Sequence, residues 1–230
     1  MSALQKLRDR IQKKGPSAVL KQLFRRYVFF HTRLVWLEHD VRTPLPPHNL
    51  KPYPPMRLEF ITVANADAFA RHFGDRVETM RELAAEGYTG LMYLDDQGDT
   101  VGFAWASTRD YFDRHFYRCN FPIKPGEYFQ FGGEAIRKYW GSSISADMQL
   151  EVWKVMAEQG CDTMVDVCDL QNVQAIKMHI RMGFQERGKI THVYRLFGHW
   201  RFFRDTLYRG SALSAFQKPD QPVASTAAAV

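Results

Sequence analysis

The sequence predicts a mixed α/β fold, with a mostly antiparallel central sheet flanked by helices and preceded by an N-terminal helical extension. Three observations lead to this prediction. Segments with strand-like alternation are interspersed with amphipathic helical segments over residues 56–198. A polar turn from Asp95 to Asp99 joins two of these strands as an antiparallel hairpin. Residues 44–55 hold six of the eleven prolines, so they form an extended connector before the domain.

Composition is that of an ordinary globular protein. The 230 residues are 45% hydrophobic and 24% charged. Three cysteines are scattered without a CxxC motif, which favours a reducing, cytoplasmic compartment. Neither a Cys/His cluster with zinc-ligand spacing nor an apolar run of about 20 residues is found in the sequence. We therefore expect no metal site, no spanning helix and, because the charged first residues lack an apolar core, no secretory signal.

Positive charge is concentrated at the N-terminus. Residues 1–33 contain nine Lys or Arg and one Asp, a net charge of +8, whereas the whole chain carries +6. Residues 2–14 and 18–37 are predicted to form two helices, the second with a broad apolar face and interspersed arginines. This face over residues 1–37 suits self-docking, homodimer packing, an anionic membrane surface bound peripherally, or an acidic acyl carrier protein. Nucleic acid is not expected, because no helix-turn-helix or aromatic-basic sheet accompanies it.

The segments are therefore 1–43 as a basic amphipathic extension, 44–55 as linker, 56–198 as the domain and 199–230 as a basic-aromatic segment with a disordered tail. Within the domain we expect helices ending near Phe73 and Ala85, a long helix over 143–159 and a short helix over 172–182. Residues 108–126 are irregular and aromatic, and either cover a substrate or pack on themselves. The predicted strands are 57–63, 89–95, 100–107, 127–131, 163–169, 184–189 and 192–197.

One turn rich in small residues precedes the long helix. It reads Lys138-Tyr139-Trp140-Gly141-Ser142-Ser143. Small residues allow backbone N–H groups to face a ligand at a helix N-terminus, where the helix dipole favours a phosphate or pyrophosphate. The same composition is also typical of a tight turn with no ligand.

The next helical segment makes the pattern more specific. It reads Asn172-x-x-Ala175-x-x-x-His179-x-x-x-Gly183-Phe184 and follows a strand. Together with the turn, this segment resembles the GCN5-related N-acetyltransferase (GNAT) superfamily, whose later helix reads Asn-x-x-Ala-x-x-x-Tyr-x-x-x-Gly-Phe. The family's loop has the form Gln/Arg-x-x-Gly-x-Gly/Ala, so this chain departs at its first and third fixed positions. The resemblance covers roughly 60% of the chain, from residue 56 to 198, and implies the GNAT fold.

The resemblance implies an acyl-coenzyme A donor, acetyl-CoA or a longer acyl-CoA. By carry-over, the loop backbone would hold the pyrophosphate, and two residues of the later helix would border the pantetheine arm. The cofactor-binding residues implied in this way are Ala135, Ile136, Arg137, Lys138, Tyr139, Trp140, Gly141, Ser142, Ser143, Asn172 and Ala175. The strands over 130–134 and 163–169 would splay and admit the thioester between them.

Two residues are candidates for acid–base catalysis. Glu134, near the end of a strand, is predicted to act as general base, through water; the alternative is a solvated carboxylate. His179 stands where many members of the family have Tyr, and a histidine can protonate a thiolate near neutral pH; the alternative is a packing role.

The function expected from this resemblance is N-acyl transfer from acyl-CoA to a primary amine by direct attack in a ternary complex. The acceptor, a small molecule or a protein amine, is not specified by the sequence. Two alternatives stay open: a GNAT-fold module that binds a ligand or partner without turnover, and an acyltransferase that uses an acyl carrier protein as donor.

Overall fold

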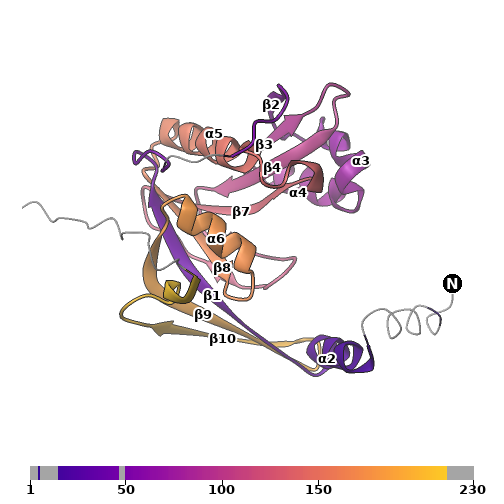
Figure 1. Ribbon diagram of the computed structural model, residues 1–230, viewed down its shortest axis with the longest axis vertical. Coiled ribbons are helices and arrows are strands. Elements are labelled where there is room, and N and C mark those ends of the chain that lie inside the picture. The colour runs from indigo at the N-terminus through magenta and orange to yellow at the C-terminus, as the bar shows by residue number, and fades with distance from the viewer. Residues whose placement is uncertain (1–4, 6–14, 47–49, 217–230) are drawn as a thin grey trace, which may run out of the picture. The chain divides into compact units, whose positions relative to one another are not determined.

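The computed structural model describes residue 5 and residues 15–46 and 50–216. The predicted helix over 2–14, apart from Gln5, and the tail after residue 216 lie outside the described residues. The chain divides into two compact units (Figure 1). The first unit comprises residues 1–36, 167–177 and 186–230, and the second comprises residues 37–166 and 178–185.

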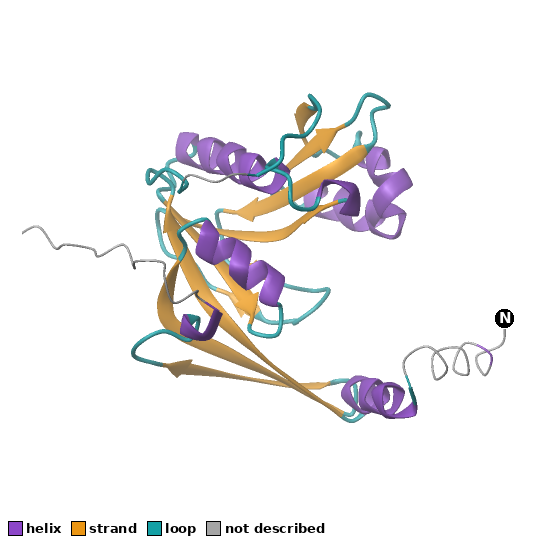
Figure 2. Ribbon diagram, in the orientation of Figure 1, coloured by secondary structure: helices purple, strands orange, loops and turns teal. Residues whose placement is uncertain are grey.

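The second unit contains a mostly antiparallel sheet flanked by helices, as predicted (Figure 2). Hydrogen-bonded neighbours follow the order β8 (Thr163–Asp169), β7 (Glu127–Ala135), β4 (Thr100–Ser107), β3 (Thr89–Leu94) and β2 (Arg57–Phe60). Of these four pairs, only β7–β8 is parallel. The elements within this unit are β2 Arg57–Phe60, η1 Ala66–Phe69, α3 Ala70–Phe73, η2 Gly74–Arg76, α4 Val77–Ala85, β3 Thr89–Leu94, β4 Thr100–Ser107, β5 Tyr111–Phe112, β6 Asn120–Phe121, β7 Glu127–Ala135, η3 Arg137–Tyr139 and α5 Ile144–Glu158. The predicted strands over 89–95 and 100–107 and the helix over 143–159 are confirmed within one or two residues.

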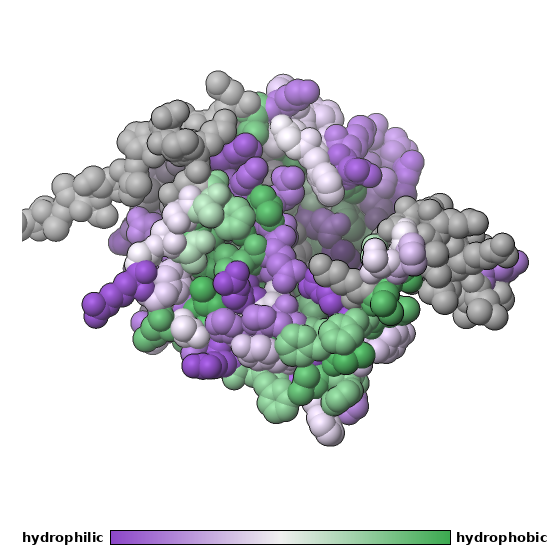
Figure 3. Space-filling model, turned by 60° about the horizontal axis from the view of Figure 1, so that its bottom comes forward, coloured by the Kyte–Doolittle hydropathy of each residue, from purple (hydrophilic) through white to green (hydrophobic). Residues whose placement is uncertain are grey.

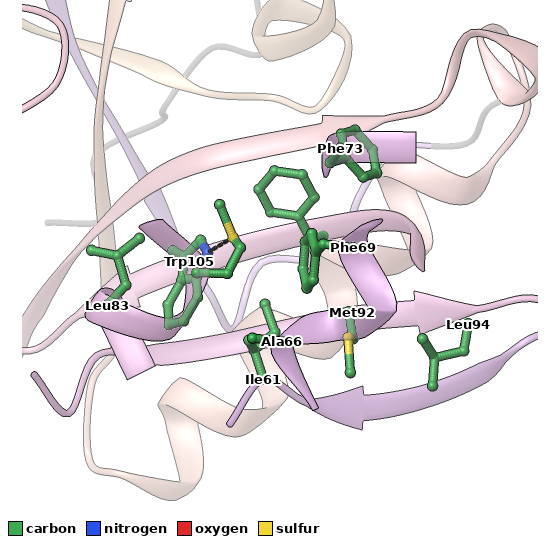
Figure 4. Packing of buried hydrophobic residues seen from close by; sticks show 10 residues of the cluster. Ile61, Ala66, Phe69, Phe73, Leu83, Met92, Leu94 and Trp105 are labelled. Carbon is green, nitrogen blue, oxygen red and sulfur yellow. Dashed lines mark hydrogen bonds between the residues drawn. The ribbon is translucent and has the colours of Figure 1, made fainter. Parts of the chain in front are cut away.

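Aromatic side chains fill the core between the sheet and the short helices η1, α3 and α4 (Figure 4). Phe69 and Phe73 both pack edge-on against Phe103 of β4, with ring centroids 5.2 and 5.1 Å apart. Trp105 is fully buried, and its indole Nε1 donates to the sulfur of Met80 at 3.3 Å. The alternation of β4 therefore places Phe103 and Trp105 on the face covered by these helices.

The irregular segment before β7 packs on the sheet through its own aromatic residues. β5 and β6 pair as a short antiparallel ribbon. Tyr111 and Phe121 are buried, and their rings lie 3.8 Å from Phe131 and 4.7 Å from Phe129, respectively. Self-packing is thus the interpretation of residues 108–126 that the contacts favour.

The first unit contains α2 Pro16–Tyr27, β10 Trp200–Leu207 and η4 Ser214–Phe216, and four elements pass through both units: β1 Phe29–Asp40, β8 Thr163–Asp169, α6 Val173–Arg181 and β9 Gln185–Leu196. The predicted helix over 18–37 is wrong beyond Tyr27, because residues 29–40 form a strand. The four consecutive residues 34–37 are all buried. A strand covered on both faces can bury every residue, whereas a helix with one apolar stripe exposes some of any four consecutive residues. The segment 1–43 is therefore not wholly helical.

The end of the chain also differs from the prediction. Residues 184–197 do not form a hairpin: β9 continues through them, and its antiparallel partner is β10. The turn lies at Phe197 and Gly198, which both have positive φ, whereas neither Ile190 nor Thr191, the residues between the two expected strands, has one. Disorder was predicted from Gly210 onward, yet Leu213 is buried and residues 211–213 bind the carboxylate of Glu186.

Candidate functional site

Strands β7 and β8 separate part-way along their length. Their parallel pairing runs from Glu127↔Thr163 to Phe129↔Val165. β7 then continues to Ala135, paired with β4 alone among the described strands. Among the described residues, the backbone of β7 from Gln130 onward therefore has no strand partner on its β8 side.

A β-bulge at Gly132 and Gly133 accompanies this divergence. In the ladder with β4, Trp105 faces Phe131 and Phe103 faces Glu134, so two glycines stand opposite one alanine. Gly132 has φ +65°, which a residue with a side chain rarely adopts. Such a bulge bends the strand and takes one residue out of the ladder. It explains why β7 turns away from β8 at this level.

A cleft of about 90 Å³, open to solvent, lies along this part of β7. Its walls come from β4, β7 and α5, with one residue of α6. The lining residues are Gly102, Phe103, Ala104, Gln130, Gly133, Glu134, Ala135, Ile144, Ser145, Met148, Gln149 and Met178. Two residues of the predicted set, Glu134 and Ala135, are among them.

The predicted pyrophosphate loop forms the connection from β7 to α5. Residues 137–139 make one 3-10 turn, and the indole Nε1 of Trp140 donates to Ala135 O at 2.9 Å, which closes the loop on itself. Gly141 has φ +81°, and a Cβ on it would meet no atom within 4 Å. Glycine is therefore needed at position 141 because of the backbone conformation, and not because a side chain would clash with a neighbour.

Backbone donors gather where this loop enters α5. Among the described residues, the N–H groups of Gly141, Ser145 and Ala146 have no hydrogen-bond acceptor; we call these three groups the amide nest. The N-cap of the helix is Ser143, whose side chain makes no capping hydrogen bond, and the Ser142 hydroxyl accepts only the Ile144 N–H, at 3.4 Å. The first N–H groups of a helix carry partial positive charge, so this nest is suited to an anion.

Three cationic residues belong to the loop or contact its backbone, and one of them was not foreseen. Arg137 and Lys138 are exposed on the loop, each near an aromatic ring of the loop itself. Lys51 belongs to the Pro-rich linker, and its carbonyl accepts the Ser143 N–H at 2.9 Å. Tyr53 anchors the linker next to Tyr93, and burial first, then a hydrogen bond with Tyr93, raises the pKa of its hydroxyl. The Ser143 N–H, one of the loop groups predicted to bind pyrophosphate, thus already donates to the linker.

Glu134 lies opposite Phe103 in the ladder, and its carboxylate is held by a cation. Arg76 of η2 contacts Glu134 Oε2 at 2.6 Å, and both side chains are about two-fifths exposed. The carboxylate is therefore oriented by the guanidinium and still reaches water. This arrangement suits a base that acts through a water molecule.

His179 is buried in a hydrogen-bonded pair. Its Nε2 lies 2.8 Å from Asp166 Oδ2, and its ring packs edge-on against Phe184 with centroids 4.8 Å apart. The side chain is only 7% exposed, and His179 is not among the residues that line the cleft. Its neighbour Met178 lines the cleft instead.

Asn172 and Ala175 belong to the first unit, and their contacts there are local. The side-chain oxygen of Asn172 accepts the Ala175 N–H at 3.2 Å, which makes Asn172 the side-chain cap of α6. The predicted start of this helix at Asn172 is therefore confirmed, and a structural reason for the motif's first residue is visible.

Comparisons with known proteins find structures with a similar fold but no match by sequence. No protein-family model matches the sequence, and no curated protein matches it at a significant level. Among solved structures, a tandem GNAT protein from the clavulanic acid biosynthesis pathway is 11% identical with a TM-score of 0.50, covering 81% of this chain and 59% of that one. A Drosophila protein is 9% identical with a TM-score of 0.50, covering 82% and 58%.

The chain has the GNAT fold. An aminoglycoside N-acetyltransferase AAC(6')-Iy, in complex with CoA, is also similar, with 18% identity, a TM-score of 0.43 and coverage of 56% of this chain and 92% of that one. The chain spans less than two thirds of the length of the clavulanic acid pathway protein and of the Drosophila protein.

Within this GNAT fold, sequence reasoning missed the pair that lies where the strands part. Gln130 and Gln149 exchange two side-chain hydrogen bonds, at 2.7 and 2.8 Å. Gln149 also donates to the sulfur of Met164 at 3.2 Å and is buried. A glutamine inside the apolar stripes of the 143–159 segment was the signal that could have revealed it.

Proposed function

We propose that the protein is an N-acyltransferase that moves an acyl group, most simply acetyl, from acyl-CoA to a primary amine. The amine nitrogen attacks the thioester carbonyl carbon within a ternary complex. A C–N bond forms, the C–S bond breaks, the amine loses one proton and the CoA thiolate gains one. The products are an amide and free CoA.

One observation carries this proposal. The cleft along β7 includes Gln130, and the same strand leads through the closed loop into the amide nest at the start of α5. A donor with an anionic end and an extended arm matches these features in this order. The nest suits its phosphates and the cleft suits its arm.

The loop residues then have distinct roles. The N–H groups of Gly141, Ser145 and Ala146 donate to the pyrophosphate, and Arg137 and Lys138 add positive charge nearby. The loop side chain Tyr139 is buried and shapes the turn.

Glu134 takes the amine proton through water in this scheme, with Arg76 holding the carboxylate in place. The acceptor amine approaches along the cleft wall that β4 and β7 form. For the thiolate proton, His179 was the candidate from sequence; its burial with Asp166 favours a positioning role instead, so solvent supplies this proton.

A turnover assay tests the proposal. Purified protein is incubated with acetyl-CoA and with longer acyl-CoA donors, each with a panel of primary amines, and thiol release is followed. We expect release that depends on the amine and yields a stoichiometric amide by mass spectrometry. An acyl-carrier-protein thioester is tested in parallel. Turnover with that donor and with no acyl-CoA would show that the acyl donor is a carrier protein and not CoA.

A binding module without turnover is the second candidate. One observation favours it: the carbonyl of Lys51 already occupies the Ser143 N–H, a group that the family pattern offers to the donor. CoA binding in the absence of turnover on every acceptor tested would support this candidate and contradict acyl transfer.

A further inference from the structure

Exposed apolar side chains gather at one end of the first unit. They come from α2 and from the turn between β9 and β10: Leu20, Phe24, Tyr27, Phe197 and Trp200, which are 69%, 51%, 56%, 59% and 56% exposed. We call these five residues the apolar tip. Figure 3 shows green, hydrophobic side chains gathered in the lower part of the face in view, with purple, hydrophilic ones beside them.

Contacts between α2 and the β9–β10 turn make the apolar tip one surface. Phe197 N–H donates to Val28 O at 2.8 Å, and an Arg195 guanidinium nitrogen lies 3.5 Å from Arg25 O. The rings of Phe197 and Trp200 pack edge-on at 6.0 Å. In α2, only Val19 is buried among the side chains that the structure describes. The helix therefore directs most of its apolar surface outward.

Arginines accompany the apolar tip on the elements that form it. The guanidinium groups of Arg25 and Arg195 both lie over the Phe30 ring, at 5.4 and 5.1 Å, and Arg204 is exposed on β10. In the sequence of the first unit, 17 Lys or Arg accompany 5 Asp or Glu, a net charge of +12, whereas the second unit has 14 against 20, a net charge of −6. The excess of positive charge is thus found in the unit that carries the apolar tip.

We propose that the apolar tip, together with Arg25, Arg195 and Arg204, binds the interface of an anionic lipid bilayer. Leu and Phe side chains insert among the acyl chains, Tyr and Trp lie at the level of the headgroups, and arginines contact lipid phosphates. Among the described residues, no helix is long and apolar enough to cross a bilayer. At 12 residues, α2 is about 18 Å long, which suits a helix lying in the interface plane.

A bilayer fits this surface better than a second copy of the chain does. A symmetric dimer through the apolar tip would bring together two copies of a unit that carries +12. An anionic surface neutralises that charge while it accommodates the apolar side chains.

Vesicle sedimentation with the full chain tests the proposal. Vesicles of phosphatidylcholine with about 30% phosphatidylglycerol are compared with phosphatidylcholine alone, at low and high salt. The wild type is expected to bind the anionic vesicles, weakly or not at all the neutral ones, and less at high salt. The double substitution Leu20→Ser/Phe24→Ser is expected to lower the partition coefficient about tenfold or more. Phe116→Ser, at an exposed phenylalanine of the second unit, is the matched control and should bind as wild type.

A charge variant keeps the test independent of α2. Arg204→Glu is expected to weaken binding to anionic vesicles several-fold, whereas Lys154→Glu, an exposed lysine of the second unit, is expected to have little effect. Circular dichroism and thermal melting confirm that each variant is folded. Equal binding to neutral and anionic vesicles, no binding to either, or unchanged binding of the double variant would overturn the proposal. So would a wild-type dimer that the double variant dissociates, or binding to an acidic carrier protein alone.

Discussion

Gln130 and Gln149 bind each other through both amide groups at the level where β7 leaves β8. Gln130 is the first residue of β7 beyond the last parallel pair, and Gln149 reaches it from α5. The pair replaces the interstrand contacts that end there. It therefore fixes the position of α5 relative to the strand at the inner end of the cleft.

Replacing one glutamine of this pair should lower the free energy of unfolding more than replacing both. Gln149→Leu leaves the Gln130 amide partly buried without its partner, so we expect a loss of about 1–3 kcal/mol in the free energy of unfolding. Gln130→Leu/Gln149→Leu should recover part of that loss. Urea denaturation of both single variants and the double variant measures the coupling. Additive losses would show that the two amides do not depend on each other.

A proline in the first turn of α5 tests the amide nest. Ser145→Pro removes one N–H donor at a helix position where proline is tolerated, and Ser145→Ala keeps the donor. A hydrogen bond to a charged group contributes about 1.5–3 kcal/mol, so CoA affinity should fall roughly tenfold or more in the proline variant only. Calorimetric titration with CoA provides the measurement. Equal losses in both variants would mean that the side chain, and not the N–H group, matters.

Glu134→Gln tests the general base. It removes the proton acceptor and retains most of the side-chain volume, so we expect kcat to fall about a hundredfold or more while CoA affinity stays near that of the wild type. Glu158→Gln, at an exposed position near the end of α5, is the control. A Glu134→Gln enzyme with wild-type kcat would remove this residue from the mechanism.

His179→Gln separates a positioning role from acid catalysis. Loss of the buried contact with Asp166 should lower the free energy of unfolding by about 1–3 kcal/mol. At saturating substrates and a temperature where the variant is folded, we expect kcat within about tenfold of wild type, with an unchanged pH profile. A folded variant that loses the acidic or basic limb of that profile would restore His179 as the acid.

A histidine pair in the first unit predicts weaker stability in mild acid. His31 Nε2 lies 3.1 Å from His192 Nδ1. Burial first, then charged neighbours such as Arg33, lowers the pKa of both imidazoles below 6.5, while Asp205 partly opposes this at His192. The unfolded chain therefore binds more protons once the pH falls below about 6.5. Stability from this pair is complete above that pH and is lost as the pH falls through the folded pKa values.

Urea denaturation at pH 7.5 and pH 5 checks this sign. The free energy of unfolding should be lower at pH 5, and a His31→Phe/His192→Phe variant should show a smaller difference between the two pH values. His72→Gln, at an exposed position, should retain the wild-type difference. A double variant with the full wild-type difference would assign the acid sensitivity to other groups.

Much of the second unit could be predicted because its elements carry local signals. The polar turn from Asp95 to Asp99 and the alternation of β4 identified the hairpin. Asn172 identified the start of α6 through its capping side chain. β1 was predicted as helix because its run of apolar residues fits both the helical and the strand periodicity. Burial of both its faces in the folded chain makes it a strand, and the sequence does not show that burial. β10 was missed because most of its residues are exposed, which leaves no alternation to read.

The candidate site was predicted only in outline. The loop over 135–143 and its glycine were identified because conformation at a helix start depends on nearby residues. The contact of Lys51 with Ser143 joins positions about ninety residues apart, and the Glu134–Arg76 pair also depends on the fold. Periodicity cannot reveal such contacts. The same holds for the burial of His179, whose role sequence reasoning could not decide.

Calorimetric titration of the wild-type protein with CoA tests the central claim most directly. The amide nest at the start of α5 and the cleft along β7 should hold one CoA per chain, with a dissociation constant of roughly micromolar order that increases as salt is raised. Inorganic pyrophosphate should compete, but much more weakly. No detectable binding at millimolar CoA would contradict both the proposed site and the acyl-CoA-dependent function.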